Sequence, residues 1–239
     1  MVEIKTTEHV AILGATGSGK SIFSQFHLLP GLLQAKKQVI VILDAKKEYS
    51  EVPNVVYTPA ELNEFLYGDK KPKGKIVRIV TEAIGKETAE AYLESAWAPY
   101  KDKYKVKSYE KGWGVRFLIE DMPIYYNSPS DTPPVLMKWV ALGRAYRRTI
   151  IGTTQRTQLV PKTPLTMIEH LFVFRIHDYD RKQFIKQYYG DKASSALTTL
   201  PKWGYAVLSE KDSGTNMPVP IMQMPTIKGV PKWPKGVEI

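Results

Sequence analysis

The chain has 239 residues, with 34 Lys and Arg against 24 Asp and Glu, and a formal net charge of +10. It contains no cysteine, which excludes disulfides, cysteine-ligated zinc and cysteine nucleophiles. Its composition, 43% hydrophobic and 24% charged, is typical of a globular protein rather than a disordered one. The apolar runs are too short to span a bilayer and the N-terminus does not resemble a signal peptide, so we expect a soluble, intracellular protein. The positive charge fits a polyanionic partner such as nucleic acid.

The hydrophobic pattern of the first half predicts strands that alternate with helices. A short buried strand at His9–Leu13 leads into a glycine-rich turn and then a helix over Lys20–Gln34, in which Pro30-Gly31 predicts a kink or an end. Strands are predicted next at Gln38–Ala45, Asn54–Tyr57 and Lys75–Thr81. A helix that starts at Thr58-Pro59 precedes the last of these strands, and a charged helix at Glu82–Ala98 follows it.

The second half continues the alternation. It carries a strand, an amphipathic helix, two strands, a late helix and a hairpin, predicted at Val115–Ile119, Val135–Arg147, Thr149–Thr153, Leu171–Ile176, Asp180–Tyr189 and around Lys211–Gly214. We therefore predict an α/β fold with a mostly parallel central sheet, helices on both faces and a C-terminal β-hairpin. Residues 1–225 are expected to form one domain, followed by a proline-rich tail, 226–239.

The turn after the first strand matches the Walker A pattern, G-x-x-x-x-G-K-[ST], in full. Its residues are Gly14, Ala15, Thr16, Gly17, Ser18, Gly19, Lys20 and Ser21. Glycines let backbone N–H groups approach phosphate oxygens, and the start of the following helix adds a positive dipole end. Lys20 can reach the β- and γ-phosphates, and the Ser21 hydroxyl can ligate Mg²⁺. This segment predicts an ATP site.

A second element is the apolar strand Val115–Ile119, which ends in Glu120 and Asp121. Such a strand resembles Walker B, which delivers one carboxylate to the shell of Mg²⁺ and one to the attacking water. The alternative is a solvated acidic turn, although the complete Walker A pattern favours the functional interpretation. Asp44 is a competing carboxylate at the end of the strand before it. We rank it lower because that strand usually lies away from the metal in P-loop folds with an extra strand.

The third element runs from Gly143 to Arg156, GRAYRRTIIGTTQR, and takes a basic helix end into a strand that closes on Thr-Thr-Gln. Gln155, at the carboxyl end of a strand next to Walker B, could contact the γ-phosphate or orient water. It could equally cap its own loop. The basic residues could act on a nucleotide or simply complement the helix dipole.

Together, GATGSGKS, FLIED and GRAYRRTIIGTTQR resemble the corresponding segments of the FtsK/HerA superfamily of DNA-pumping P-loop ATPases, and the resemblance covers about residues 10–176. It implies a RecA-like P-loop fold. The chain contains no evident membrane anchor or additional barrel, and in this compactness it is similar to the genome-packaging ATPases of icosahedral double-stranded DNA viruses with internal membranes. The composition, rich in Lys, Tyr and Ile, is compatible with an archaeal virus such as the turreted icosahedral viruses of Sulfolobus.

The resemblance also implies roles for single residues. Lys20 and Ser21 would bind phosphate and Mg²⁺, Glu120 would serve the metal's water shell, and Asp121 would be the general base. Gln155 would sense the γ-phosphate. Arg144 would be an arginine finger supplied to the neighbouring subunit, with Arg147 and Arg148 as alternatives. Many relatives end Walker B in Asp-Glu, whereas this chain has Glu-Asp, so Glu120 stays a second candidate for activating water.

These roles imply an ATP- and Mg²⁺-dependent translocase of double-stranded DNA that forms a ring of five or six subunits in the host cytoplasm, with a capsid vertex or membrane protein as a further partner. The alternatives are a small-molecule P-loop kinase and a nucleotide-switched virion-assembly protein. The four histidines lack metal-ligand spacing. DNA contacts are predicted on phosphates, although for each candidate segment the pattern favours a solvated charged face. Those segments are Lys70–Lys75, Lys101–Lys111 and Tyr125–Asp131.

Overall fold

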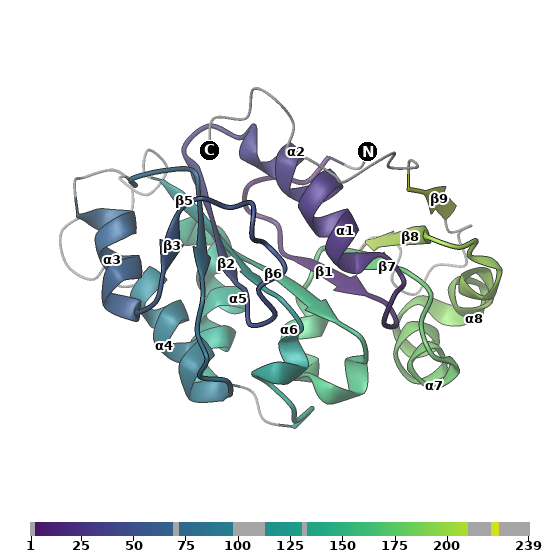
Figure 1. Cartoon of the computed structure of the whole chain (residues 1–239). Coiled ribbons are helices and arrows are strands. Elements are labelled where there is room, and N and C mark those ends of the chain that lie inside the picture. Colours follow the sequence, from purple (N-terminus) through teal and green to yellow (C-terminus); the bar gives the residue numbers. More distant parts are fainter. Residues whose placement is uncertain (1–2, 69–71, 98–112, 131–132, 210–220, 225–239) are drawn as a thin grey trace.

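The protein is described by a computed structural model, which covers residues 3–68, 72–97, 113–130, 133–209 and 221–224. Its strands form one nine-stranded sheet in the order β3-β4-β2-β5-β6-β1-β7-β8-β9 (Figure 1). The pairs from β3 to β7 are parallel, whereas β8 pairs antiparallel with β7 and with β9. The predicted α/β class, with a mostly parallel sheet and a C-terminal antiparallel pair, is confirmed. The turn predicted around Lys211–Gly214 lies outside the described residues.

The strands are short, and all but β3 and β9 at the two ends of the sheet are almost wholly buried, as expected for a sheet that is covered on both faces. They are β1 (Val10–Leu13), β2 (Gln38–Leu43), β3 (Val55–Val56), β4 (Ile76–Ile79), β5 (Gly114–Ile119), β6 (Arg148–Thr154), β7 (His170–Val173), β8 (Gly204–Ser209) and β9 (Ile221–Gln223). Seven of the nine, β1 to β7, coincide with the strands predicted from the sequence. Strand β7 is shorter than predicted, because after Val173 the chain leaves the ladder to hold the P-loop.

Alternate residues of each strand enter two separate hydrophobic clusters, one on each face of the sheet. Ile12 and Ile40 pack with Phe23 and Leu29 of the first helical segment, whereas Val41, Phe117 and Ile150 belong to the other face. Figure 1 shows α1 and α2 over one face and α4, α5 and α6 beneath the other. The alternation of side chains along each strand thus decides which residues pack against the helices of each face.

The helical segments are α1 (Lys20–Phe23), η1 (Ser24–Leu28), α2 (Leu29–Leu33), α3 (Pro59–Tyr67), α4 (Lys86–Trp97), η4 (Met122–Ile124), α5 (Pro134–Tyr146), η5 (Thr157–Leu159), α6 (Lys162–Thr166), α7 (Asp178–Asp180), η6 (Arg181–Ile185), α8 (Lys186–Ala196) and η7 (Leu197–Thr199). The predicted start at Thr58-Pro59 is confirmed, since Thr58 Oγ1 accepts from the Glu61 amide at 3.2 Å. The late helix is longer than predicted, and η6 and a non-helical Gly190 interrupt it.

The first helix does not end at Pro30. Proline lacks the N–H that would continue an α-helix and crowds the carbonyl four residues before it. The chain instead widens into the π-helix η1, where the Leu29 amide donates to the Ser24 carbonyl, and α2 then continues through Pro30 to Leu33. The helix that begins in the P-loop therefore runs from the carboxyl edge of the sheet to the amino-terminal edge, where β2 begins.

Candidate functional site

The Walker A turn lies at the carboxyl edge of the sheet, between the end of β1 and the start of α1. Gly17 and Gly19 have φ of 72° and 103°, which L side chains rarely adopt, so glycine is required at both. The Ala15 amide donates to the Arg175 carbonyl at 2.7 Å, which ties the loop to the chain after β7. Lys20 Nζ donates to the Gly14 and Ala15 carbonyls at 2.7 and 3.2 Å, and its pKa is lowered, chiefly by burial. The backbone carbonyls of the loop thus hold the Lys20 ammonium group.

Glu120 follows β5 directly and is 3% exposed. Ser21 Oγ donates to one of its carboxylate oxygens at 3.3 Å, and the buried Tyr49 hydroxyl donates to the other at 2.9 Å. Burial raises the pKa of Glu120 to about 7, against the lowering effects of the Tyr49 hydrogen bond and of Lys20. Tyr49 was not singled out in the sequence, and it contacts Glu120 only because β2 lies beside β5.

Asp121 has left-handed backbone angles, φ 54° and ψ 65°, which are uncommon for a residue other than glycine and cluster at functional sites. Its amide donates to Thr153 Oγ1 of β6 at 2.7 Å, which holds the turn in place. Its carboxylate forms an ion pair with Lys46, from the turn after β2, and accepts from Gln155 Nε2 at 3.4 Å. Lys46 is a second residue that the sequence did not indicate.

Gln155 connects the acidic strand end to the P-loop. Its amide nitrogen donates to Asp121, and its oxygen accepts from Thr16 Oγ1 at 2.7 Å. The side chain does not cap its own loop; that contact is made by Thr154, whose hydroxyl bonds Arg156 at both backbone groups. Between the two interpretations left open by the sequence, the geometry favours the one in which Gln155 faces the nucleotide loop.

Asp44 lies at the same edge but takes no part in this network. It is fully buried, and both of its carboxylate oxygens are bound within its own turn, by the amides of Glu48 and Tyr49 at 2.9 and 3.0 Å. Burial raises its pKa, whereas those two amides and Arg78 act to lower it. Asp44 shapes the turn that carries Lys46 and Tyr49.

The basic residues of the Gly143–Arg156 segment lie at the opposite, amino-terminal edge of the sheet, where α5 ends and β6 begins. Arg148 is 1% exposed and donates to the Trp113 carbonyl and the Tyr67 hydroxyl at 3.0 and 3.2 Å. A side chain so enclosed does not reach a neighbouring subunit, so the prediction of Arg148 as a finger is wrong. Arg144 is 54% exposed at its side chain and pairs with Glu169. It can act on a nucleotide only in trans.

Gly143 has a packing role. A Cβ at this position would collide with the carbonyl oxygen of Arg148, so only glycine lets α5 approach the start of β6. Arg147 ends the helix in the left-handed conformation, with φ 53°. The Gly-Arg part of the motif thus describes a tight helix-to-strand turn that presents Arg144 outward.

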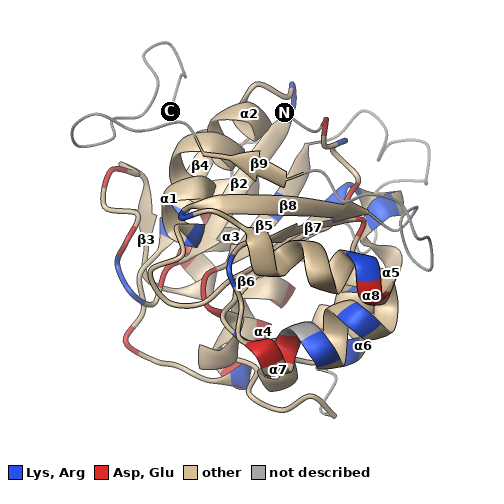
Figure 2. Ribbon diagram, turned by 90° about the vertical axis from the view of Figure 1, so that its right-hand side faces the viewer, with Lys and Arg blue, Asp and Glu red and all other residues tan. Residues whose placement is uncertain are grey.

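The candidate DNA segments are only partly described. Lys101–Lys111 and the first residues of Lys70–Lys75 lie outside the described residues. In the loop after β5, Tyr125 and Tyr126 are 2% and 3% exposed and pack in the core, so they offer nothing to DNA. Figure 2 shows Lys and Arg distributed over several elements, including α5, α6 and α8, rather than gathered on one of them.

The site offers oxygen ligands of the kind that Mg²⁺ prefers, since the Ser21 hydroxyl and the Glu120 carboxylate are hydrogen-bonded to each other beside the P-loop. Among the described residues, no group of three or more His, Asp or Glu side chains is arranged to hold a metal ion alone. In P-loop sites a magnesium ion takes phosphate oxygens of the nucleotide and water molecules as its further ligands.

Comparison with known proteins settles the family. The family model of the helicase HerA central domain matches residues 2–138, which include the P-loop, Glu120 and Asp121. The chain belongs to the HerA central-domain family. A search among curated proteins gives no match. None of the helices in the described part of the chain has the length and apolar character that a bilayer-spanning segment needs.

Solved structures extend the likeness of this HerA-type domain to more than nine tenths of the chain. The genome-packaging NTPase B204 of Sulfolobus turreted icosahedral virus 2, bound to ATPγS, superposes with a TM-score of 0.72 over 92% of this chain and 98% of that one, at 14% identity. B204 of Sulfolobus turreted icosahedral virus gives a TM-score of 0.69 with the same coverage, at 19% identity. The cytoplasmic domain of the type VII secretion ATPase EccC of Thermomonospora curvata gives 0.55 over 95% of this chain and 25% of that one, at 11% identity. The predicted P-loop fold and superfamily are confirmed.

Proposed function

We propose that this HerA-type ATPase domain translocates double-stranded DNA with energy from ATP hydrolysis, and that it packages a viral genome into a preformed capsid. The observation that carries the proposal is the convergence of Thr16, Ser21, Glu120, Asp121 and Gln155 at one edge of the sheet. Family membership supports the motor activity, and the fold likeness to the viral packaging NTPases B204 supports the packaging role.

In the proposed mechanism the Walker A residues 14–21 bind the phosphates, with Lys20 on the β- and γ-phosphates. Ser21 and Glu120 would hold Mg²⁺, which neutralises phosphate charge when bound. Asp121 accepts a proton from the attacking water, whose oxygen bonds the γ-phosphorus as ADP leaves. Gln155, between Thr16 and Asp121, orients that water and senses whether the γ-phosphate is present.

The ion pair between Lys46 and Asp121 supports a gate on this step. Lys46 occupies the Oδ2 atom of Asp121, so its departure would free that oxygen for the attacking water. An incoming γ-phosphate is a competing anion for Lys46 at the same place. Hydrolysis would then begin only when the triphosphate is seated.

Arg144 is proposed to act in trans. Because it lies at the edge opposite its own P-loop, a ring of subunits is needed to bring it to a nucleotide, and hydrolysis then depends on the neighbour.

We also propose that the ring has five or six subunits. Its proposed location is the cytoplasm, with recruitment to a capsid vertex or membrane protein, and its proposed source is an archaeal virus. The single sheet supports one domain over residues 1–225, with 226–239 as a tail.

The decisive experiment measures ATP turnover with and without double-stranded DNA for the wild type, Lys20→Ala and Arg144→Ala. A translocase is stimulated by DNA, and both variants lose turnover by about 10²-fold or more. Phosphate transfer to a small acceptor with no effect of DNA would establish a kinase instead. Nucleotide-dependent assembly without turnover would establish an assembly switch.

A matched variant separates the two possible roles of Arg144. Glu169→Gln removes the charge that pairs with Arg144 but keeps an oxygen for the His9 amide, which donates to Glu169 at 2.6 Å. If Arg144 acts in trans, Glu169→Gln retains turnover while Arg144→Ala does not. Equal losses in both variants would show that the pair only supports the fold.

A further inference from the structure

The last residues of β6 contact the turn after β5 one after another. A Cβ on Gly152 would collide with Met122 Sδ, so glycine lets that turn lie directly on the strand. Thr153 Oγ1 accepts from the Asp121 amide, and Gln155 Nε2 donates to the Asp121 carboxylate. The end of β6 therefore holds Asp121 at two places, its backbone and its side chain.

The Thr153 hydroxyl is shared by both acidic residues at the end of β5. A hydroxyl has one proton and two lone pairs, so it can accept from one group and donate to another. Thr153 Oγ1 accepts from the Asp121 amide at 2.7 Å. It also hydrogen-bonds to the Glu120 carboxylate, a contact that lowers the pKa of Glu120 against the larger raising effect of burial. The Glu120 carboxylate thus takes the proton of the hydroxyl and leaves a lone pair for the Asp121 amide.

Asp121 needs such a partner because the backbone ladder ends just before it. The last residue pair between β5 and β6 is Ile119 with Gly152. Asp121 then turns into the left-handed region, and its amide bonds the Thr153 side chain in place of a strand carbonyl. A left-handed backbone at a residue other than glycine persists where surrounding contacts enforce it. Thr153 supplies one of these contacts.

Threonine is suited to hold a neighbour in one position. Its β-branched side chain is stiff about χ1, and Thr153 is fully buried, so the direction of its hydroxyl is fixed. The side chain lies on the same face of the sheet as Ile151, which packs in the cluster that contains Phe23 of α1. The hydroxyl is therefore presented by a rigid strand rather than by a loop.

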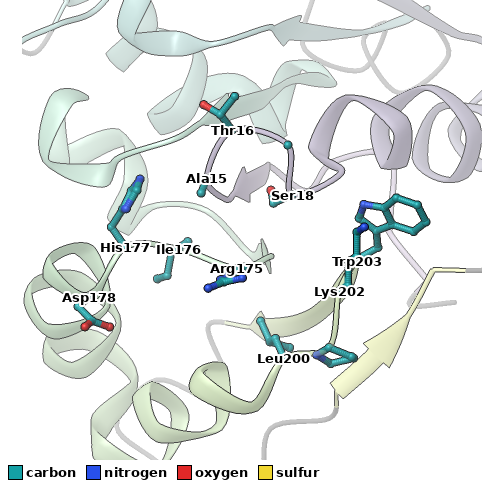
Figure 3. A pocket seen from close by; sticks show the side chains of 12 residues that line it. Ala15, Thr16, Ser18, Arg175, Ile176, His177, Asp178, Leu200, Lys202 and Trp203 are labelled. Carbon is teal, nitrogen blue, oxygen red and sulfur yellow. The ribbon is translucent and has the colours of Figure 1, made fainter.

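The same end of β6 reaches the P-loop through Gln155. Its side-chain oxygen accepts from Thr16 Oγ1 at 2.7 Å. Thr16 also lines a pocket of about 680 Å³ beside the P-loop, together with the segments after β7 and before β8 (Figure 3). The Thr154 hydroxyl bonds both backbone groups of Arg156 and so fixes the turn that carries Gln155. One short stretch of strand thus ties Asp121 to the loop that binds phosphate.

We propose that Thr153 is the positioning residue of the general base, since its hydroxyl fixes the Asp121 backbone and thereby aims the Asp121 carboxylate at the attacking water. The inference rests on the proposed function, because that function assigns the base to Asp121. Thr153 acts through Asp121 and not on the nucleotide itself.

The test compares Thr153→Val with Thr153→Ser in steady-state ATP hydrolysis by the full chain at saturating Mg²⁺. Valine keeps the shape and removes the hydroxyl, so kcat per folded molecule falls by about 10- to 100-fold, the effect of a misplaced catalytic group. The KM for ATP stays within about twofold, because the P-loop is unchanged, and Thr153→Ser keeps kcat within about threefold. Thr149→Val is the matched control and keeps kcat. Thr149 lies on the same strand and is equally buried, but its hydroxyl has no hydrogen-bond partner among the described residues.

A double-mutant cycle with Asp121→Asn separates positioning from a merely structural role. If Thr153 acts through Asp121, adding Thr153→Val to Asp121→Asn lowers kcat by less than about twofold. A further 10- to 100-fold loss in that background would overturn the proposal, as would an unchanged kcat in Thr153→Val alone or an equal loss in Thr149→Val. Should Thr153→Val not fold, Thr153→Ser and Thr153→Ala form a second pair that differs only in the hydroxyl.

The same measurements separate this inference from the proposed function. Turnover that DNA does not stimulate contradicts translocation, yet the role of Thr153 stands if the cycle gives the expected result. An inactive Asp121→Asn beside a fully active Thr153→Val contradicts only the role of Thr153. A fully active Asp121→Asn contradicts the assignment of the base and the role of Thr153 with it.

Discussion

The two edges of the sheet carry similar residue types in opposite roles. At the carboxyl edge, Asp121, Gln155 and Lys46 are linked to one another and to the P-loop, so each is tied to the nucleotide site. At the amino-terminal edge, His9 and Arg148 are enclosed, and their side chains bond the backbone and the Tyr67 hydroxyl of their own chain. The difference shows that in this parallel sheet the polar groups of the nucleotide site gather at the carboxyl edge, whereas these enclosed groups at the other edge hold the fold.

The largest expected effect is at the carboxyl edge, in Asp121→Asn. The amide has nearly the same shape and can still contact Gln155, but it accepts no proton from water and forms no ion pair with Lys46. We expect turnover to fall by about 10²- to 10⁴-fold with little change in thermal stability. Steady-state ATP hydrolysis and a melting curve on the same sample measure the two effects.

Asp44→Asn is the control for that comparison. Asp44 is the same residue type and lies at the same edge, but its oxygens hold the amides of Glu48 and Tyr49. We expect a loss of stability with turnover per folded molecule largely kept. If Asp44→Asn abolishes turnover and Asp121→Asn does not, the assignment of the general base to Asp121 is wrong.

The second prediction concerns the amino-terminal edge. Arg148→Ala leaves a cavity and removes the donor from the Trp113 carbonyl and the Tyr67 hydroxyl, so we expect about 3–4 kcal/mol of destabilisation. Denaturant unfolding measures the loss, and turnover per folded molecule stays near that of the wild type. Arg144→Ala is expected to behave in the reverse manner, with lost turnover and retained stability. An Arg148→Ala protein that is stable but inactive would restore Arg148 as a finger.

The third prediction is a dependence of stability on pH that comes from His9. Burial, helped by the charge of Arg144, lowers the pKa of His9 from 6.5 to about 4, and Nδ1 accepts from the Ile150 amide at 3.0 Å. The unfolded chain binds a proton near pH 6.5 that the folded chain refuses, so stability is full above that pH and falls between pH 6.5 and 4. The difference corresponds to about 3 kcal/mol.

His9→Asn tests this account, because its side-chain oxygen can accept from the Ile150 amide and does not titrate. We expect the free energy of unfolding of the variant to fall less between pH 6.5 and 4 than that of the wild type. If the free energies of unfolding of the two proteins fall in parallel across that window, with a constant difference, the acid sensitivity comes from other groups.

Much of the carboxyl edge could be predicted from the sequence, and the reason is geometric. Glu120, Asp121 and Gln155 each follow a strand, and the ends of parallel strands meet at one edge whatever the order of the strands. The contacts of Lys46 and Tyr49 could not be predicted, because they require β2 to lie beside β5, and hydrophobic periodicity does not encode which strands are neighbours.

Arg148 shows a second limit. In the sequence it belongs to a basic run at a helix end, the pattern of a solvated surface. In the fold it is the first residue of β6, and its guanidinium is enclosed because the Gly143 turn draws α5 close to the strand. Composition indicates a charged run, but only the position of the turn decides which of its members faces the solvent.

The smallest expected effect is at Tyr49, a buried residue that also contacts the site at the carboxyl edge. Tyr49 is as buried as Arg148, yet its hydroxyl donates to Glu120 at 2.9 Å and so positions a carboxylate of the site. Tyr49→Phe keeps the ring and removes one hydrogen bond, so we expect the Mg²⁺ concentration for half-maximal turnover to rise by about three- to tenfold while maximal turnover changes little. Tyr125→Phe is the control, since Tyr125 is also buried but its hydroxyl has no hydrogen-bond partner among the described residues. A loss in maximal turnover that excess Mg²⁺ does not restore would show that Tyr49 acts on the chemistry rather than on the metal ligand.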